Sequence, residues 1–285
     1  MSELVKRILT ALVAAPLALV MIYLGGLPLA AFLALVSAGC AWEFYRIAAA
    51  GGLEPLDPIG IPLAGAIPLV TYAAAVGVYR PTLAVPAVAL LVILAAVIWA
   101  RGTGRRPLGA ASATVMGVLY TGGSLSFGYA LREYPYAVGD RAGTAVVALP
   151  LILTWASDIG AYFVGRAVGG PKLLPSVSPG KTRSGALGGL LATIIVAWLY
   201  IRFALAPVAS LTMTLPATIV FGLVISVAAQ VGDLTESLLK REANVKDSSR
   251  LLPGHGGLLD RLDSLLFVLP VAYLLFGWLL IPAVP

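Results

Sequence analysis

Charged residues are concentrated in one stretch of the chain, KREANVKDSSRLLPGHGGLLDRLD, which runs from Lys240 to Asp263. It contains 9 of the 32 charged residues and the only histidine, His255. The rest of the chain is rich in hydrocarbon, since 60% of all residues are hydrophobic. Clustered acids and bases in such a chain favour the binding of an anion together with a metal ion.

A glycine-rich turn, PGHGG, encloses His255 within this stretch. Glycines allow backbone N–H groups to approach a ligand closely, as they do at many phosphate sites. Asp260 and Asp263 follow at i and i+3 on one face of a predicted helix, with Arg261 beside them. A turn followed by acids that favour the helix dipole explains one of these aspartates. Two aspartates, an arginine and a lone histidine favour a ligand site.

A polar stripe precedes this turn in GDLTESLLKREAN, residues 232–244. Its members recur at i, i+3, i+4, i+7, i+8 and i+11, on one side of a predicted helix. They are Asp233, Glu236, Ser237, Lys240, Arg241 and Asn244. A solvated helix face explains the two basic residues well. It explains the two acids poorly, because they lie at the edge of an apolar run.

An aspartate also interrupts an apolar segment further upstream, at Asp158 in TWASDIGAYFVGR. A carboxylate inside a membrane segment costs about 2.5–3.5 kcal/mol on insertion scales, so it needs a cavity, a cation or a partner. A functional carboxylate is the prediction, and a structural ion pair with Arg166 is the alternative.

The stretch SVSPGKTRSG, residues 176–185, has the composition of a phosphate site. Ser178, Lys181 and Thr182 stand beside a predicted helix start, and helix N-termini attract anions. Pro175 occupies the position where a P-loop needs its first glycine, so this is not a Walker A motif. A helix cap with a lysine that only sets membrane topology is the alternative.

The elements that carry these residues are predicted membrane helices. Only 11% of residues are charged and the mean hydropathy is +0.97, whereas soluble domains carry about 25% charged residues. Runs of about 20 apolar residues can each cross the hydrocarbon core of a bilayer. The fold class is therefore all-α, a polytopic membrane protein with about nine transmembrane helices. We expect them near residues 8–25, 27–47, 59–79, 82–100, 108–130, 143–165, 185–206, 214–236 and 263–283.

The distribution of basic residues predicts a cytoplasmic N-terminus. With nine spans, 15 of the 19 Lys and Arg residues fall on the cytoplasmic side and 4 on the other, as the positive-inside rule requires. The net charge of +6 is thus a topology signal, and no nucleic acid is expected as a partner. Both long loops, about 166–184 and 237–262, become cytoplasmic. Residues 1–142 are expected to form an N-terminal region of about five spans, and residues 143–285 a catalytic region of about four.

Topology places every candidate on the same side of the membrane. One cysteine, Cys40, and one histidine exclude an intrachain disulfide and make zinc a poor fit, so any metal is a hard cation such as Mg²⁺. Carboxylates from separate spans are expected to meet near the cytoplasmic surface and hold this cation with an anionic substrate. The set is Asp158, Lys181, Asp233, Glu236, His255, Asp260 and Asp263.

The stretch SLLKREANVKDSSRLLPGHGGLLDRLD, residues 237–263, resembles the signature of phosphatidate cytidylyltransferases, also called CDP-diacylglycerol synthases. SDIGAYFVGR, SPGKT and GDLTES resemble segments of that family in the same order, so the similarity covers about residues 150–270. The first five spans resemble the family only in hydrophobic profile. Ser184 departs from the family, whose members often carry an acid or amide there.

The resemblance implies a reaction in which CTP and phosphatidic acid give CDP-diacylglycerol and pyrophosphate with Mg²⁺, in a homodimer. It implies that Asp233 and Asp260 hold the metal, with K⁺ as a second cation. Catalytic roles are expected for Asp233, Asp260, Lys240, Arg241, His255 and Asp263. Substrate binding is expected at Ser178, Lys181, Thr182, Lys246, Asp247, Gly256, Gly257, Arg261 and Asp158. The compact chain without a transit peptide favours the bacterial inner membrane, with the active site facing the cytoplasm.

Three other functions compete with this interpretation. Intramembrane acids and broken helices also suit an ion-coupled transporter, but transporter sites lie near the bilayer midplane between repeats. A CTP-dependent lipid kinase would transfer the γ-phosphate. A CDP-alcohol phosphotransferase would need a denser aspartate motif than Asp260-x-x-Asp263.

Overall fold

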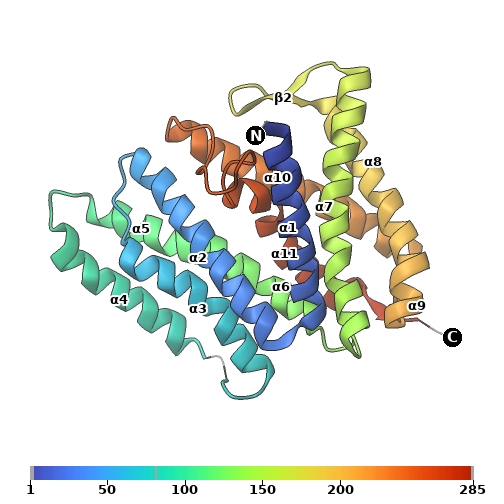
Figure 1. Cartoon of the computed structure of the whole chain (residues 1–285), viewed down its shortest axis with the longest axis horizontal. Helices are drawn as coiled ribbons and strands as arrows, with labels where there is room; N and C mark the ends of the chain where they lie inside the picture. The colour runs from blue at the N-terminus through green and yellow to red at the C-terminus, as the bar shows by residue number, and fades with distance from the viewer. Residues whose placement is uncertain (1–2, 81, 284–285) are drawn as a thin grey trace. The chain divides into compact units, whose positions relative to one another are not determined.

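The computed structural model describes residues 3–80 and 82–283, which are almost entirely helical (Figure 1). The helices in chain order are α1 (Glu3–Leu24), α2 (Gly26–Ala50), α3 (Asp57–Ala75), α4 (Ala84–Arg101), α5 (Pro107–Gly117), α6 (Ser124–Arg132), α7 (Asp140–Val168), α8 (Arg183–Tyr200), α9 (Ala206–Ala209), α10 (Leu215–Glu242) and α11 (Leu259–Leu279). Two π-helical segments, η1 (Val118–Gly123) and η2 (Ile201–Leu205), connect neighbouring helices. Four short strands pair in twos: β1 (Lys172–Leu174) with β2 (Ser178–Thr182), and β3 (Leu211–Thr212) with β4 (Ile281–Pro282).

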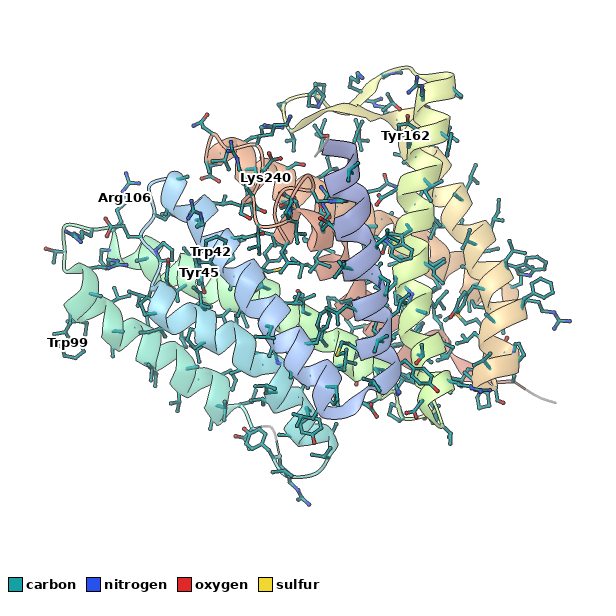
Figure 2. All side chains as sticks on the ribbon, in the orientation of Figure 1. Trp42, Tyr45, Trp99, Arg106, Tyr162 and Lys240 are labelled. Carbon is teal, nitrogen blue, oxygen red and sulfur yellow. The ribbon has the colours of Figure 1, made fainter. Side chains whose placement is uncertain are left out.

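The prediction of an all-α polytopic membrane protein is confirmed. In the described part of the chain, seven helices are long and apolar enough to cross a membrane: α2, α3, α4, α7, α8 with its continuation to Ala209, α10 and α11. Many of their large apolar side chains face outward. Trp99 on α4, for example, is 82% exposed and projects away from its helix (Figure 2).

Two of the nine predicted spans differ from these seven. The first, near residues 8–25, lies in α1, whose described apolar part is the shorter segment Leu12–Leu24. The fifth, near 108–130, is divided into α5, η1 and α6. The count of nine and the cytoplasmic N-terminus stay predictions.

Contacts divide the chain into two compact units that do not follow chain order. The first unit comprises Met1–Tyr129 and Leu239–Leu262, and the second comprises Ala130–Leu238 and Asp263–Pro285. The loop between α10 and α11 thus belongs with the N-terminal helices. The sequence-based division at residue 142 stays a prediction.

Close helix packing around Tyr45 organises the first unit. In this unit α2 lies beside α3, and α5 contacts α2, α3 and α4 (Figure 1). The Tyr45 ring is fully buried, and its hydroxyl donates a hydrogen bond to the Thr114 carbonyl at 2.8 Å. Side chains at Gly60 or Gly117 would overlap this ring. Small residues at these crossings let the backbones approach, which is how membrane helices pack when water does not drive their association.

We expect Gly122→Ala to destabilise the first unit strongly. A Cβ at Gly122, in η1, would overlap the backbone of Ala64 on α3, and backbone cannot rotate away as a side chain can. Overpacking of this kind costs typically about 1–3 kcal/mol. Thermal unfolding of the detergent-solubilised protein measures the effect. Gly277→Ala is the matched control, since nothing lies within 4 Å of a Cβ at that helical glycine.

The second unit places α7, α8 and α10 together at the level of the predicted site. α7 packs along α8 through glycines, and a Cβ at Gly160 would lie 2.7 Å from the Gly188 carbonyl oxygen. The hydroxyls of Ser157 on α7 and Ser226 on α10 share a hydrogen bond of 2.8 Å. The Gln230 amide of α10 donates to the Ala186 carbonyl of α8 at 3.2 Å. These polar contacts, one buried and one partly buried, fix the register of the three helices.

The polar stripe predicted on α10 ends earlier than expected. α10 ends at Glu242, so Asn244 lies beyond the helix and the expectation that it continues the same face is wrong. Asn244 has a φ of 54°, its N–H bonds to the Arg241 carbonyl, and the Val245 N–H bonds to the Lys240 carbonyl. This pattern is a Schellman motif, in which asparagine tolerates the left-handed conformation that stops a helix.

Candidate active site

The second unit contains an open cleft of about 740 Å³, lined by residues of α7, α8, α10 and the β1–β2 hairpin. Four predicted site residues line it: Asp158, Lys181, Thr182 and Asp233. The Lys181 ammonium lies 2.7 Å from a carboxylate oxygen of Asp233, and both side chains are about one third exposed. Ser237 donates to the other Asp233 oxygen at 3.3 Å. The structure therefore joins Lys181 and Asp233, which are 52 positions apart in the sequence, in one ion pair.

A β-hairpin and a helix cap position Lys181. It is the penultimate residue of β2, and Ser178 at the other end of that strand is paired with Leu174 of β1. The Thr182 hydroxyl accepts a hydrogen bond from the Gly185 N–H at 3.1 Å and caps α8. Ser184 donates to the Gly169 carbonyl. The helix-cap alternative is thus confirmed for Thr182, while Lys181 pairs with an acid across the cleft lining.

Tyr162 and the basic residues Arg166 and Lys172 also line this cleft. Figure 2 shows Tyr162 on α7 near the hairpin, and the Arg166 guanidinium donates to its hydroxyl at 3.0 Å. In the alternative interpretation, Asp158 only forms a structural ion pair with Arg166. The cleft thus presents three cations and two acids to a solvent-accessible space, a mixture that suits a polyphosphate bound with a metal ion.

A second group of predicted residues meets in the first unit. The Lys240 ammonium lies 2.6 Å from a carboxylate oxygen of Asp260, and the side chains are only 12% and 6% exposed. Figure 2 labels Lys240 beside the loop that follows α10. Asp260 also accepts hydrogen bonds from the backbone N–H of Ser248 at 3.0 Å and of Gly257 at 2.8 Å. Asp260, in the first turn of α11, therefore accepts hydrogen bonds from α10 and from two parts of the loop.

The glycine turn brings backbone close to this carboxylate. Gly256 has a φ of +83°, which a side chain rarely tolerates, and a Cβ there would lie 2.8 Å from an Asp260 oxygen. The Leu252 N–H bonds to the Gly256 carbonyl and the His255 N–H to the Leu252 carbonyl, both at 2.9 Å. Within the described residues, Nδ1 of His255 is buried and has no hydrogen-bond partner. The sequence predicted that the backbone at these glycines comes close to a ligand. In the structure this backbone lies close to the Asp260 carboxylate.

The other predicted residues are placed as follows. Arg241, Lys246, Asp247 and Arg261 are exposed in the first unit. Glu236 is buried in the second unit, and Asp263 of that unit accepts a hydrogen bond from the Ser264 N–H at 2.6 Å. Their proposed catalytic or binding roles stay predictions.

The donor atoms present fit a magnesium ion. Among the described residues, no three His, Cys, Asp or Glu side chains gather closely enough to enclose a metal by themselves. Mg²⁺ needs fewer, because it keeps several waters and is completed by substrate phosphates. Asp233 offers oxygen ligands at the cleft lining. Asp260 offers carboxylate oxygens as well, which accept hydrogen bonds from Lys240, Ser248 and Gly257.

Comparison with known proteins assigns the chain to a family. The model of the cytidylyltransferase family matches residues 5–279. The chain belongs to the cytidylyltransferase family. Both groups described above lie within the matched region, and so do the N-terminal helices that resembled the family only in hydrophobic profile.

Several curated proteins are similar to this member of the cytidylyltransferase family. A phosphatidate cytidylyltransferase of Haemophilus influenzae is 46% identical over 144 residues, which cover 49% of this chain and 48% of that protein. The enzyme of the same name from Bacillus subtilis is 42% identical over 138 residues, 48% of this chain and 49% of that protein. The one from Brucella suis is 41% identical over 170 residues, 59% and 58%. The chain spans about half the length of the curated relatives it matches.

Sequence reasoning missed one buried acid in this chain, Glu43 on α2. Its side chain is inaccessible to solvent and accepts hydrogen bonds from four donors, three in the loop between α10 and α11 and one at the first residue of α11. The signal was present in the sequence, since Glu43 interrupts the apolar run GCAWEFYR just as Asp158 interrupts its own. An acid inside a membrane span is a functional candidate by default.

Proposed function

We propose that this protein is a phosphatidate cytidylyltransferase, which converts CTP and phosphatidic acid to CDP-diacylglycerol and pyrophosphate. The observation that carries the proposal is the pairing of each predicted metal-binding aspartate with a predicted phosphate-binding lysine, Asp233 with Lys181 and Asp260 with Lys240. The cytidylyltransferase family match and the names of the similar proteins support the same reaction.

The reaction requires two anionic reactants to meet. A phosphate oxygen of phosphatidic acid attacks the α-phosphorus of CTP, the bond from that phosphorus to the α,β-bridging oxygen breaks, and pyrophosphate leaves. The attacking oxygen already carries charge, so the protein needs no strong base. Positioning and neutralisation of charge supply most of the acceleration in such phosphoryl chemistry. Lysine ammonium groups are suited to this role because they pair with phosphate oxygens.

The acid–lysine pairs explain how such a site stays ordered before substrate arrives. A lone buried lysine or carboxylate is costly, whereas a pair keeps both groups charged and oriented. When polyphosphate enters, its oxygens offer the lysine a second set of acceptors, and the carboxylate gains acceptor capacity for a metal. Asp233 and Asp260 are the proposed ligands of Mg²⁺, which supplies polarisation of the phosphoryl group when bound. K⁺ is a proposed second cation.

The proposal extends to where the enzyme works. The seven apolar helices support a protein of the lipid bilayer, in which phosphatidic acid already resides. We place the active site on the cytoplasmic face of the bacterial inner membrane, and we propose a homodimer. No nucleic acid partner is proposed.

Labelled nucleotide tests the reaction directly. Purified protein is incubated with phosphatidic acid, Mg²⁺ and CTP that carries label at either the α or the γ phosphate. Transfer of α label to lipid with release of pyrophosphate is the expected result. Transfer of γ label would identify a lipid kinase, and no transfer of either label would contradict the proposal and favour transport.

A further inference from the structure

Glu43 holds the loop that carries the Lys240–Asp260 pair. It lies on α2, among the N-terminal helices, and it is buried completely. One oxygen accepts from the Ser249 hydroxyl at 2.6 Å and from the Leu258 N–H at 2.9 Å. The other accepts from the Ser248 hydroxyl at 2.8 Å and from the Leu259 N–H at 2.6 Å. All four acceptor positions of the carboxylate are therefore used.

The four donors come from the two ends of the loop. Ser248 and Ser249 lie shortly after α10, and Leu258 and Leu259 stand at the start of α11. The first N–H groups of a helix have no partner within the helix, and a carboxylate there is favoured by the helix dipole. Glu43 thus serves as an external cap for α11 and joins it to the segment around Ser248.

Glu43 and Asp260 share the same short segments. The Ser248 hydroxyl bonds to Glu43 while its N–H bonds to Asp260. Likewise, the N–H of Gly257 bonds to Asp260, and the next two N–H groups bond to Glu43. A Cβ at Gly257 would lie 2.5 Å from a Glu43 oxygen, so the glycine is needed for this approach. A displacement of Glu43 would therefore move the donors that orient Asp260.

The packing of α2 supports a fixed position for this carboxylate. Gly39, one turn before Glu43, lets α2 approach the loop, since a Cβ there would lie 3.1 Å from the Leu258 side chain. Full burial prevents Glu43 from touching a substrate or a metal ion in the arrangement described. Its influence on the reaction has to pass through the loop.

We propose that Glu43 is a positioning residue for the reaction, an inference that rests on the proposed function. Its carboxylate holds the loop between α10 and α11 in one conformation. In that conformation Asp260, Lys240 and the glycine turn keep the positions that the reaction needs. An N-terminal membrane helix is then part of the catalytic apparatus as well as an anchor. This assigns a chemical role to a region that resembled the family only in hydrophobic profile.

Glu43→Gln is the decisive variant because it keeps the shape of the side chain. Serine hydroxyls can turn and accept from an amide, but backbone N–H groups cannot. One of the two N–H groups, from Leu258 or Leu259, then faces an NH₂ group. We expect kcat to fall by about 10- to 100-fold, as for residues that orient metal ligands, with KM for both substrates unchanged. Glu43→Asp should recover part of kcat, because the carboxylate keeps its four acceptor positions.

Two further measurements separate positioning from general stability. Thermal unfolding in detergent should show that Glu43→Gln remains folded, and hydrogen exchange should accelerate in residues 248–259 while α3 is unchanged. Glu54→Gln is the matched control, since the Glu54 side chain is 47% exposed and forms surface ion pairs with Arg101 and Arg105. Its kcat should equal that of the natural protein.

The outcomes distinguish this inference from the proposed function. If the natural protein transfers label and Glu43→Gln has normal kcat, the positioning role is wrong and the function stands. A loss of activity that matches the fraction of unfolded protein also overturns it. If the natural protein transfers no label, the proposed function fails, and exchange in residues 248–259 decides whether Glu43 holds the loop: unchanged exchange overturns the inference.

Discussion

Replacing Asp260 with asparagine is expected to abolish transfer of the cytidylyl group to lipid. The side chain is 6% exposed and accepts from Lys240, Ser248 and Gly257 at once. Asparagine has one acceptor oxygen, and its NH₂ group would face a donor on the other side. It also removes the negative charge beside Lys240 and the proposed metal ligand. We expect kcat to fall by at least about 100- to 1,000-fold, the loss typical of one essential electrostatic group.

A double variant shows whether activity is lost because Asp260 acts in the reaction or because the buried Lys240 ammonium is left without its partner. Removing one partner of a buried ion pair destabilises a protein by about 3–5 kcal/mol, so Asp260→Asn alone should lower the unfolding temperature. Combining it with Lys240→Met removes the second charge and should restore part of the stability without restoring activity. Glu242→Gln is the control, because Glu242 is exposed at the end of α10. Near-normal activity in Asp260→Asn would remove Asp260 from the active site.

The membrane fold could be predicted because hydropathy is a local property of the sequence. The seven long apolar helices agree with seven of the nine predicted runs to within a few residues at most ends. The π-helical segment η1 could not be predicted in the same way. It contains Gly122, which contacts the backbone of Ala64 more than 50 residues earlier, and such packing leaves no local signal.

The candidate site was predicted in composition but not in pairing. The residues that the charge clusters and intramembrane acids indicated fall in two groups, with Asp158, Lys181 and Asp233 in the second unit and Lys240 and Asp260 in the first. Nothing in a single sequence states which lysine meets which acid, because the partners come from different elements. The glycine turn was interpreted as a cradle for phosphate, whereas its N–H at Gly257 serves Asp260.

Glu43 shows that a site residue can be missed when each part of the sequence is interpreted separately. The rule that an acid in an apolar span needs a partner applied to it as fully as to Asp158. Asp158 stood near other polar motifs along the chain, while Glu43 stood about 200 residues before its hydrogen-bond partners. Because of its neighbours along the chain, Asp158 was predicted as a site residue and Glu43 was not. The free-energy cost of placing a carboxylate in an apolar span applies to both residues.

Replacing Lys181 with methionine is expected to weaken CTP binding. The lysine side chain lies 2.7 Å from Asp233 in the cleft that Asp158 also lines, so its loss leaves two acids without this cation and the triphosphate without one donor. Hydrogen bonds between charged groups contribute about 1.5–3 kcal/mol, which corresponds to an increase in KM for CTP of about 10- to 100-fold. Initial rates at varied CTP, with phosphatidic acid saturating, measure the effect.

The same variant decides between the two interpretations of the SPGKT segment. Thr182 caps α8 through its own hydroxyl, so Lys181→Met should leave the helix and the unfolding temperature intact. Arg183→Met is the matched control, because Arg183 is an exposed neighbouring cation that lies outside the cleft lining. A higher KM alone would assign Lys181 to ground-state binding of the nucleotide, and a lower kcat would assign it to charge that develops on departing pyrophosphate. Unchanged kinetics would mean that Lys181 only sets membrane topology beside a helix cap. That result would contradict the prediction that the cleft binds the triphosphate of CTP.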